Sequence, residues 1–270
     1  MPAHAVEALL QRAHDVAVTL AHEAGALQMR ARAGVTVRAT KAHRNDPVSD
    51  VDLASETLIV DGLRTAFPDD GVLGEEGGGT PGTSGRRWIV DPIDGTRNYV
   101  SAAGPWSVSV ALQDGPHDAD LAVAVVHDPA LGETFSAVRG QGCLLGRTPV
   151  TASSCRRLDE ALAGLSFDQS PETKGRMAPV VADLLPIVGD IRRIPAALHL
   201  AYLAAGRLDC GVLVGAKLWD LAAGLLLARE AGLTLGGAGG RPAPGLVVAA
   251  APGLWADFSA GAPVRRLTAG

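Results

Sequence analysis

The sequence predicts an α+β / α/β chain with an antiparallel sheet in its N-terminal half and alternating strands and helices in its C-terminal half. Three short apolar segments, 106–112, 121–127 and 133–138, follow one another through Gly, Asp and Pro turns, as in an antiparallel sheet. Beyond a break near 146–151, strand and helix patterns alternate, which is typical of βα units. We therefore expect an α+β subdomain over residues 1–147 and an α/β subdomain over 148–270.

Two helices are predicted at the start of the chain. Apolar residues recur at three- and four-residue steps from Ala3 to Arg32, which indicates one apolar helix face. A second helix is expected from Leu53 to about Phe67, with Asp52 at the N-cap position. Gly62 weakens the expected continuity of that helix. The segments before it, 35–37 and 41–52, are too short or too rich in turn formers to assign.

Two short strands are expected between the second helix and the antiparallel set. The first covers Val72–Glu76 and ends in paired acids, and a Gly/Pro/Thr/Ser segment over 77–85 then predicts a mobile, water-facing loop. The second is the apolar run 88–90, which Pro92 should end because it forces the preceding residue into an extended conformation.

The C-terminal half alternates the two kinds of pattern to its end. The predicted strands are 161–167, 191–194, 208–214, 233–235 and 246–250, and the predicted helices are 174–188, 196–206 and 219–232. With 270 residues, 47% of them hydrophobic, the chain is long enough to bury a large core.

Composition and charge exclude several classes of function. A net charge of −5 provides no basic surface for nucleic acid or for an anionic membrane. The three cysteines form neither a CxxC pair nor an even disulfide set, which favours a reducing compartment. We see no signal segment and no apolar run long enough to span a bilayer. The expectation is a cytoplasmic protein without a nucleic-acid or membrane partner.

The segment Asp91-Pro92-Ile93-Asp94-Gly95-Thr96 carries the strongest chemical signal. A buried strand leads into two carboxylates three residues apart, and Gly95 allows the backbone to approach a ligand closely. Hard anionic ligands beside the Gly95 and Thr96 amides suit a cation that itself holds a phosphate. The alternatives are a pair of turn-capping acids, or an aspartyl-nucleophile phosphatase loop, in which the nucleophile would fall on Pro92. We interpret the two acids as metal ligands.

Three other acids are candidates whose ordinary interpretation is structural. Asp220 begins an apolar helix, where most aspartates are caps and where the helix dipole keeps a carboxylate ionised. Asp52 is equally explained as a helix cap. Paired glutamates such as Glu75-Glu76 are usually surface charge, although one of them could meet Asp91 across a sheet and share a cation with it.

Taken together, these segments resemble the lithium-sensitive, magnesium-dependent inositol monophosphatase family over most of the chain. The resemblance rests on five motifs in the expected order: Asp46-Pro47-Val48-Ser49 with Asp52 and Glu56; Gly74-Glu75-Glu76; Asp91 to Thr96 with Asn98-Tyr99; Ala204 to Asp209; and Trp219-Asp220 with Ala222-Ala223-Gly224. It implies a layered αβαβα sandwich and a homodimer.

The resemblance also implies roles for individual residues. Glu75, Asp91 and the carbonyl of Ile93 would hold one Mg²⁺, and Asp91, Asp94 and Asp220 a second, with a third, weaker ion reached by Glu75 through water. Asp52 and Thr96 would orient and deprotonate the attacking water. The substrate would contact Asp94, Gly95, Thr96, Ala196 and Asp220.

This chemistry is physically coherent without the family. Displacement at phosphorus needs charge neutralised on the attacking and leaving oxygens together, which two cations roughly 3.5–4 Å apart achieve. Oxygen ligands alone favour Mg²⁺ or Mn²⁺ over zinc. We therefore expect an enzyme, a Mg²⁺-dependent phosphomonoesterase acting on a small phosphorylated substrate, inositol 1-phosphate.

Fewer sequence features support the choice of substrate than support the type of reaction. Where inositol-specific members tend to carry an acid, seven residues before Asp220, this sequence has Leu213, and Ile194-Pro195 replaces a polar pair. Ala196 could still offer its amide. Lys217 and Arg193 are interpreted as surface charges, with attraction of a second anionic group as the alternative.

Other functions within and outside the reaction class remain open. Histidinol phosphate and sugar bisphosphates are alternative substrates, whereas the Arg97-Asn98-Tyr99 sequence after Thr96 argues against nucleotide bisphosphates. A member of another class would be a catalytically silent relative that binds metal and phosphate without turnover.

Overall fold

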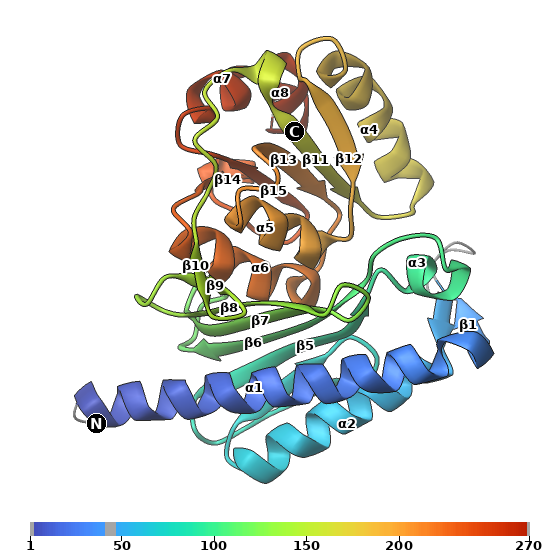
Figure 1. The fold of residues 1–270 in the computed structure, drawn as a ribbon, viewed down its shortest axis with the longest axis vertical. Helices are drawn as coiled ribbons and strands as arrows, with labels where there is room; N and C mark the ends of the chain where they lie inside the picture. Colours follow the sequence, from blue (N-terminus) through green and yellow to red (C-terminus); the bar gives the residue numbers. More distant parts are fainter. Residues whose placement is uncertain (1–2, 41–46, 269–270) are drawn as a thin grey trace.

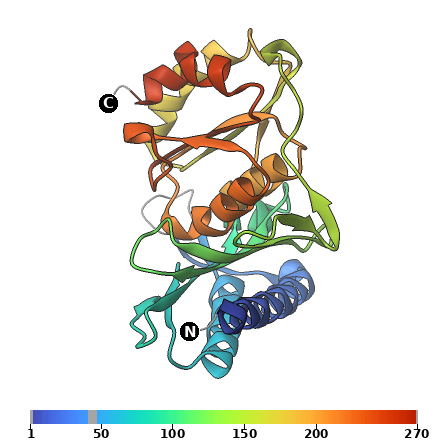
Figure 2. The ribbon, with the colours of Figure 1, turned by 90° about the vertical axis from the view of Figure 1, so that its left-hand side faces the viewer.

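The computed structural model describes residues 3–40 and 47–268 and shows five layers, helix–sheet–helix–sheet–helix (Figure 1). Helices α1 and α2 form one outer layer, and α4, α7 and α8 form the other, so the chain begins and ends on opposite sides of the molecule (Figure 2). This is the predicted layered αβαβα sandwich. Among the described residues, no helix combines the length and apolarity needed to cross a membrane.

The elements have the following bounds. The α-helices are α1 (Ala3–Ala31), α2 (Asp50–Ala66), α3 (Thr96–Ser101), α4 (Pro171–Leu184), α5 (Ala196–Ala204), α6 (Leu218–Glu230), α7 (Trp255–Ala260) and α8 (Ala262–Thr268). The strands are β1 (Val37–Thr40), β2 (Pro47–Ser49), β3 (Gly71–Gly74), β4 (Gly78–Thr80), β5 (Arg86–Asp94), β6 (Ser107–Asp114), β7 (Leu121–Asp128), β8 (Glu133–Val138), β9 (Cys143–Leu145), β10 (Thr148–Val150), β11 (Leu162–Phe167), β12 (Asp190–Arg193), β13 (Cys210–Val214), β14 (Thr234–Gly236) and β15 (Leu246–Ala250).

The first sheet has eight strands in the order β10-β9-β8-β7-β6-β5-β3-β4. All its pairings are antiparallel, as predicted, except that β3 and β5 run parallel. Alternate side chains leave the sheet on opposite faces. Trp88 and Val90 join the core beneath α1 and α2, whereas Ile89 joins the central core on the other face. Both faces of β5 are therefore buried.

The second sheet has the order β12-β11-β13-β15-β14 and is mixed. Side chains along its strands also alternate between the two faces of the sheet. Val212 and Val248 pack toward α4, α7 and α8, whereas Leu213 and Val247 pack toward the central helices. The central helices α5 and α6 lie between the two sheets, and residues 221–228 of α6 are all buried. A helix segment covered on every side is apolar all round, which explains the uninterrupted apolar sequence of residues 221–228.

The prediction that the central strand ends at Asp91 is wrong. Strand β5 continues through Pro92 to Asp94, and its pairing shifts between Asp91↔Ser109 and Asp94↔Ser107, so that β5 has one residue more than β6 there. Proline lacks an N–H and is tolerated in a strand at such a bulge. The bulge lies between the two predicted metal ligands.

The prediction that Asp52 is an N-cap is also wrong. Helix α2 begins at Asp50, and its N-cap is Ser49, whose side-chain oxygen accepts the N–H groups of Val51 and Asp52. In return, Asp52 accepts the backbone N–H of Ser49 at 2.9 Å. This reciprocal arrangement is a capping box, and it fixes the Asp52 side chain in the third position of the helix.

Gly62 does not interrupt α2, contrary to the expectation from helix propensity. A Cβ atom at Gly62 would lie 2.3 Å from the Leu20 side chain of α1. The glycine is therefore explained by the close approach of the two helices, and its cost in backbone entropy is offset by packing.

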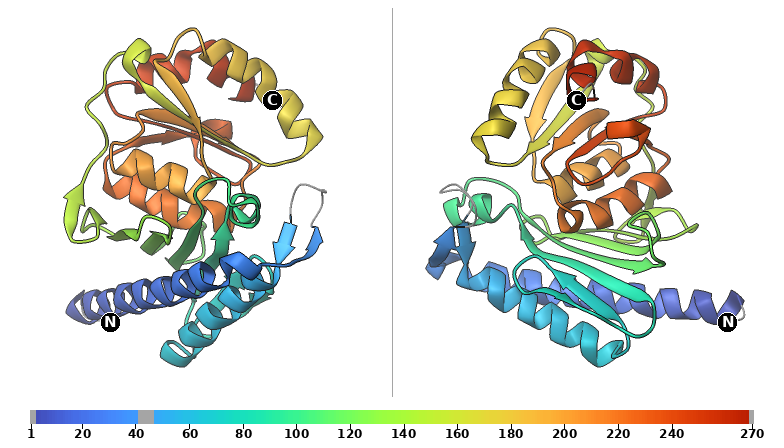
Figure 3. Two further views of the ribbon diagram at one scale, coloured as in Figure 1. Left: turned by 45° about the vertical axis from the view of Figure 1, so that its right-hand side comes forward. Right: turned by 180° about the vertical axis from the view of Figure 1, so that it is seen from behind.

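Several short elements were not predicted. They are the hairpins β1–β2 and β9–β10, strand β4 within the loop 77–85, and helices α3, α7 and α8. Helix α3 packs beside β2 (Figure 3). The predicted boundary at 147/148 falls in the turn between β9 and β10, and β10 still belongs to the first sheet. Of the turn-rich segment 41–52, residues 41–46 lie outside the described residues.

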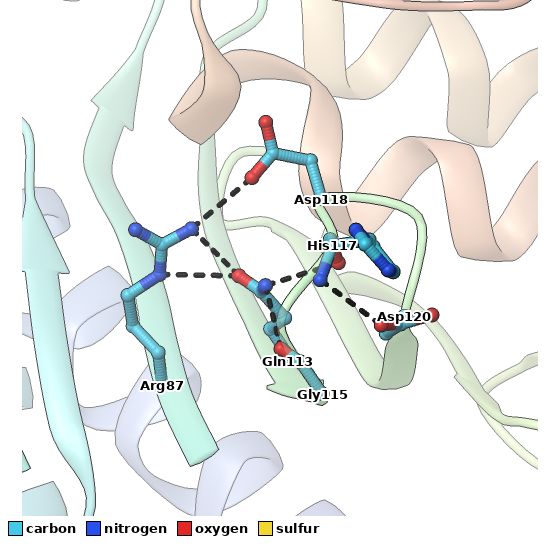
Figure 4. A network of polar contacts seen from close by, with 6 residues as sticks. All are labelled: Arg87, Gln113, Gly115, His117, Asp118 and Asp120. Atoms are coloured by element: carbon cyan, nitrogen blue, oxygen red, sulfur yellow. Dashed lines mark hydrogen bonds and ion pairs between the residues drawn. The ribbon is translucent and has the colours of Figure 1, made fainter. Parts of the chain in front are cut away.

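A polar network holds the beginning of β5, at the opposite end of the strand from Asp91 and Asp94. Arg87 donates to the Gln113 amide oxygen at 2.6 and 3.1 Å and to Asp118 at 3.2 Å (Figure 4). Gln113 in turn donates to the carbonyls of Gly115 and His117 and so secures the turn between β6 and β7. The Asp118 carboxylate in this network is therefore remote from Asp91 and Asp94.

One buried side chain in α5 has no polar partner among the described residues. His199 is fully buried, and neither ring nitrogen makes a hydrogen bond. Its ring fits over Gly164 and Gly211, which lie opposite each other on β11 and β13, and a Cβ atom at either would be 2.2 Å from Nε2. Burial lowers the pKa of His199 to about 3.

Replacing His199 with leucine is expected to reduce the loss of unfolding free energy that occurs as pH falls below 6.5. An unfolded histidine titrates near 6.5, so protonation favours the unfolded chain as pH falls below that value. This ring alone should cost the folded wild type roughly 2 kcal/mol between pH 6.5 and 5. Urea unfolding at pH 7.5 and pH 5 measures the difference. Parallel stability curves for wild type and His199→Leu would contradict it. The other buried titrating groups, such as His127, whose pKa is lowered by burial to about 4, contribute equally to both proteins.

Candidate active site

A cleft of about 340 Å³ opens where the end of β5 meets the first residues of α3, α5 and α6. Eight of the predicted site residues line it: Glu75, Asp91, Ile93, Asp94, Gly95, Thr96, Ala196 and Asp220. The ninth, Asp52, contacts Thr96 from behind. Residues separated by up to 168 positions in the sequence, Asp52 and Asp220, are thus brought together.

Three carboxylates form the floor of the cleft. One oxygen each from Asp91, Asp94 and Asp220 lies within 4.8 Å of the other two. Asp91 is completely buried and Asp94 is 7% exposed. Glu75 reaches the same place because β3 pairs with β5 so that Gly74 lies opposite Val90, which brings the residue after β3 beside Asp91.

The cluster is electrostatically costly as it stands. Burial raises the pKa of Asp91 well above its usual range, and the charges of Glu75, Asp94 and Asp220 raise it further. Burial, and then Asp220, do the same to Asp94. The Oδ2 atom of Asp91 is buried and has no hydrogen-bond partner among the described residues. An all-oxygen set with an unsatisfied carboxylate oxygen fits a hard divalent cation such as Mg²⁺ or Mn²⁺.

Backbone amides orient these carboxylates without neutralising them. The Ala197 amide, at the start of α5, donates to Asp94 Oδ2 at 2.7 Å, and the Ala196 amide also contacts Asp94. Asp220 is the third residue of α6 and accepts the N–H of Lys217 at 2.6 Å. Helix N-termini favour anions, so the first turns of α5 and α6 help to hold Asp94 and Asp220 in the cluster.

Thr96 and Asp52 form a buried pair beside the cluster. The Thr96 hydroxyl lies 2.9 Å from Asp52 Oδ1 and 3.0 Å from the Ile93 carbonyl oxygen. Burial raises the pKa of Asp52 to about 6, against the opposing effect of its hydrogen bonds with Ser49 and Thr96. A carboxylate with this pKa can accept a proton near neutral pH.

Gly95 occupies a backbone conformation that other residues rarely adopt. Its φ of 95° and ψ of 35° turn the chain from β5 into α3. A Cβ atom there would also lie 2.8 Å from the Pro195 ring. Both the turn and the contact between the two halves of the chain therefore require glycine.

Gln28 supports the β5 bulge and was not predicted as a functional residue. Its side-chain amide donates to the Pro92 carbonyl at 2.8 Å, and its oxygen accepts the Trp106 indole N–H at 2.9 Å. Gln28 is fully buried. A polar residue on the apolar face of α1, four positions after Ala24, is the sequence signal that could have revealed it.

Glu56 was predicted as part of a family motif but without a role, and in the structure it holds the turn that follows Glu75. Its carboxylate accepts the Glu76 N–H at 2.9 Å and the Gly77 N–H at 2.5 Å. A Cβ atom at Gly74 or Gly77 would lie within 2.8 Å of that carboxylate. Glu56 is 6% exposed, so these bonds are shielded from water.

Replacing Glu56 with glutamine is expected to weaken Mg²⁺ binding about tenfold, since an amide can accept only one of the two N–H groups and presents its NH₂ to the other. Isothermal titration with Mg²⁺ measures the change, and circular dichroism checks the fold. Asp61→Asn, at an exposed position of the same helix, is the matched control. An unchanged Mg²⁺ affinity in Glu56→Gln would show that Glu75 does not depend on this anchor.

The residues that depart from the family pattern lie in different surroundings. Leu213 is fully buried in the central core and does not line the cleft. Ile194 and Pro195 form part of the cleft wall. Lys217 and Arg193 are both exposed, as predicted for surface charges, but Arg193 lines the cleft, as does Arg97.

Comparison with known proteins places the chain among close relatives. The model of the family described as "Inositol monophosphatase family" matches residues 9–263. The inositol-1-monophosphatase SuhB of Mycobacterium tuberculosis (strain H37Rv) is 40% identical over 268 residues, 90% of each chain. The Nus factor SuhB of Xylella fastidiosa is 40% identical over 201 residues, 73% of this chain and 71% of that one. The structure of the Thermotoga maritima IMPase matches with a TM-score of 0.82 and 30% identity over 94% of this chain and 95% of that one.

Proposed function

The chain belongs to the inositol monophosphatase family, and from that premise we propose that it is a Mg²⁺-dependent phosphomonoesterase whose substrate is inositol 1-phosphate. Membership of the family supports phosphatase activity. That the metal is Mg²⁺ and that the substrate is inositol 1-phosphate are our inference. The relative from Mycobacterium tuberculosis is named an inositol-1-monophosphatase, which supports this substrate.

The observation that carries the proposal is the buried acidic cluster. The three aspartate oxygens that lie within 4.8 Å of one another, with Glu75 beside them, repel each other unless a cation is present. Protein interiors do not hold several unpaired carboxylates in one place without cost. We infer that Glu75, Asp91 and the Ile93 carbonyl hold one Mg²⁺ and that Asp91, Asp94 and Asp220 hold another, with a third ion weakly held through Glu75.

When bound, such ions supply Lewis-acid neutralisation of phosphate charge and lower the pKa of a water molecule. The protein's own contribution is to manage the proton and the substrate. The Thr96 hydroxyl donates to Asp52, so its lone pairs can receive a proton from water in the cleft while Asp52 takes the hydroxyl proton. The amides of Gly95 and Thr96 would bind phosphate oxygens, and Ala196, which lines the cleft, would contact the leaving group.

The test is phosphate release, with and without Mg²⁺, from inositol 1-phosphate, histidinol phosphate, fructose 1,6-bisphosphate and 3′-phosphoadenosine 5′-phosphate. The proposal expects Mg²⁺-dependent turnover that is fastest on inositol 1-phosphate. Preference for another ester would keep the reaction and replace the substrate. Mg²⁺ binding without release from any ester would instead support a catalytically silent relative. Sedimentation velocity would test the homodimer expected from the family, and fractionation of cells its cytoplasmic location.

A further inference from the structure

The two sheets contribute different parts of the cleft. The proposed metal ligands come from β5, from the turn after β3 and from α6, whereas Asp168, Arg193 and Gly215 come from the second sheet. Strands β12, β11 and β13 are neighbours that run parallel, and these three residues lie at or just after their carboxyl ends. In α/β sheets, ligands bind outside the carboxyl ends of parallel strands. Because the phosphate is assigned to the acidic cluster, this edge is left for the alcohol part of the ester.

Asp168 supplies an ionised acceptor at this edge. Its carboxylate accepts the Ser170 N–H at 2.8 Å through Oδ1 and the Thr173 hydroxyl at 3.0 Å through Oδ2. A carboxylate can accept about four hydrogen bonds, so these two leave acceptor positions on both oxygens. Burial acts to raise the pKa of Asp168, but the hydrogen bonds with Ser170 and Thr173 and the Lys217 charge together hold that pKa below its usual value. The side chain is therefore an anion at neutral pH.

Gly215 makes room for the Asp168 carboxylate. A Cβ atom at Gly215 would lie only 1.9 Å from Asp168 Oδ2, and the glycine has a φ of 79°, which other residues rarely adopt. The backbone of Asp168 is held as well, because its N–H donates to the Val214 carbonyl at 3.1 Å. The carboxylate is thus fixed over the end of β13.

Arg193 supplies donors at the same edge. Its guanidinium carbon lies 4.3 Å from the centre of the Phe167 ring, and one terminal nitrogen donates to the Phe167 carbonyl at 3.2 Å. Stacking on the ring restricts the side chain and leaves most of the five N–H donors of a guanidinium for a ligand. Within residues 3–40 and 47–268, no carboxylate is paired with Arg193. Asp168 and Arg193 therefore do not neutralise each other.

Together these two side chains suit a neutral polyol better than an anion or a hydrocarbon. Each hydroxyl group is both a donor and an acceptor, so one can donate to the Asp168 carboxylate while a neighbouring one accepts from the Arg193 guanidinium. A second anionic group on the substrate would be repelled by Asp168. An apolar alcohol would cover both charges without replacing their hydrogen bonds to water, which is costly.

We propose that Asp168 and Arg193 determine the specificity for the alcohol part of the substrate by hydrogen bonding to neighbouring hydroxyl groups of a neutral polyol. This inference rests on the proposed function and assigns the residues that select its substrate. The acidic cluster acts on a phosphate that every monoester carries, so it cannot distinguish one ester from another. The carboxyl edge of the second sheet can do so.

Two esters that share a cyclohexane ring and differ in its hydroxyl groups, inositol 1-phosphate and cyclohexyl phosphate, test the assignment with Mg²⁺ present. Each is compared by kcat and KM, and cyclohexyl phosphate also by its inhibition constant against inositol 1-phosphate. Asp168→Asn keeps the side-chain shape and its bonds to Ser170 and Thr173 but replaces one acceptor with an NH₂ group. We expect Asp168→Asn and Arg193→Gln each to lower kcat/KM for inositol 1-phosphate about tenfold, mainly through KM, as for one charge-assisted hydrogen bond.

The same variants should change the KM and the inhibition constant of cyclohexyl phosphate by less than about twofold, because that ester has no hydroxyl group to lose a contact. Asp190→Asn and Arg192→Gln are the matched controls, since these residues pair with each other at exposed positions of β12 and do not line the cleft. Equal losses on both esters, or no loss on inositol 1-phosphate, would overturn this assignment and leave the proposed function standing. Absence of Mg²⁺-dependent release from inositol 1-phosphate by the wild type would overturn the proposed substrate, and the assignment with it.

Discussion

Asp94→Asn is expected to lower kcat by about three orders of magnitude while making the metal-free protein more stable. Losing one metal ligand removes several kcal/mol of charge neutralisation in the transition state. The pKa of Asp94 is raised by burial and by Asp220, so a neutral side chain relieves repulsion in the folded state at pH 7.5. The amide oxygen of asparagine can still accept the Ala197 N–H. We expect the metal-free melting temperature to rise by about 3 °C.

Phosphate release and thermal unfolding, each with and without Mg²⁺, measure both effects. Mg²⁺ should raise the melting temperature of the wild type and have little effect on Asp94→Asn, because a ligand stabilises only the protein that binds it. Asp118→Asn removes a carboxylate at the remote end of β5 (Figure 4) and serves as the control. A variant at position 94 with near-normal turnover would refute the assignment of Asp94 as a metal ligand.

Thr96→Val should lower kcat about a hundredfold or more with little change in Mg²⁺ affinity. Valine has nearly the shape of threonine but lacks the hydroxyl that lies 2.9 Å from Asp52. General-base assistance is typically worth about 10²–10⁴ in rate. The expected signature is therefore a loss confined to turnover, measured by steady-state kinetics beside a Mg²⁺ titration.

Two further variants separate proton transfer from packing. Thr96→Ser keeps the hydroxyl and should retain most of the activity. Asp52→Asn should be about as slow as Thr96→Val, because an amide oxygen can still accept the Thr96 hydroxyl but cannot take its proton. If Thr96→Ser were as impaired as Thr96→Val, the methyl group and its packing would be responsible, and the proton-transfer role would be wrong.

The sequence was most informative where one short segment carries a whole function. Glu75 and Asp91 each follow a short apolar run, so strand patterns indicated that one of the paired glutamates could meet Asp91 across a sheet, as it does. The order of the two halves also followed from local periodicity, because alternation and helical spacing depend only on near neighbours. These predictions needed no knowledge of the tertiary contacts.

The remaining features depend on contacts that local patterns do not contain. The bulge that carries β5 past Pro92 depends on Gln28, 64 positions earlier in the chain. The Ala197 amide reaches Asp94 only because the two halves of the chain pack together. Gly62 was expected to weaken the helix because helix propensity is a local property and takes no account of the Leu20 side chain that fills the space beside it. In each case a long-range contact overrides the local preference.

The packing of the His199 ring over Gly164 and Gly211 has an evolutionary consequence. Gly164, Gly211 and His199 fill one volume between them, so substitution at any one of the three changes what the other two can accept. A lineage in which either glycine acquires a side chain must first, or at the same time, shorten position 199. The three positions should therefore vary together among relatives, and the accepted order of change should begin at the helix rather than in the sheet.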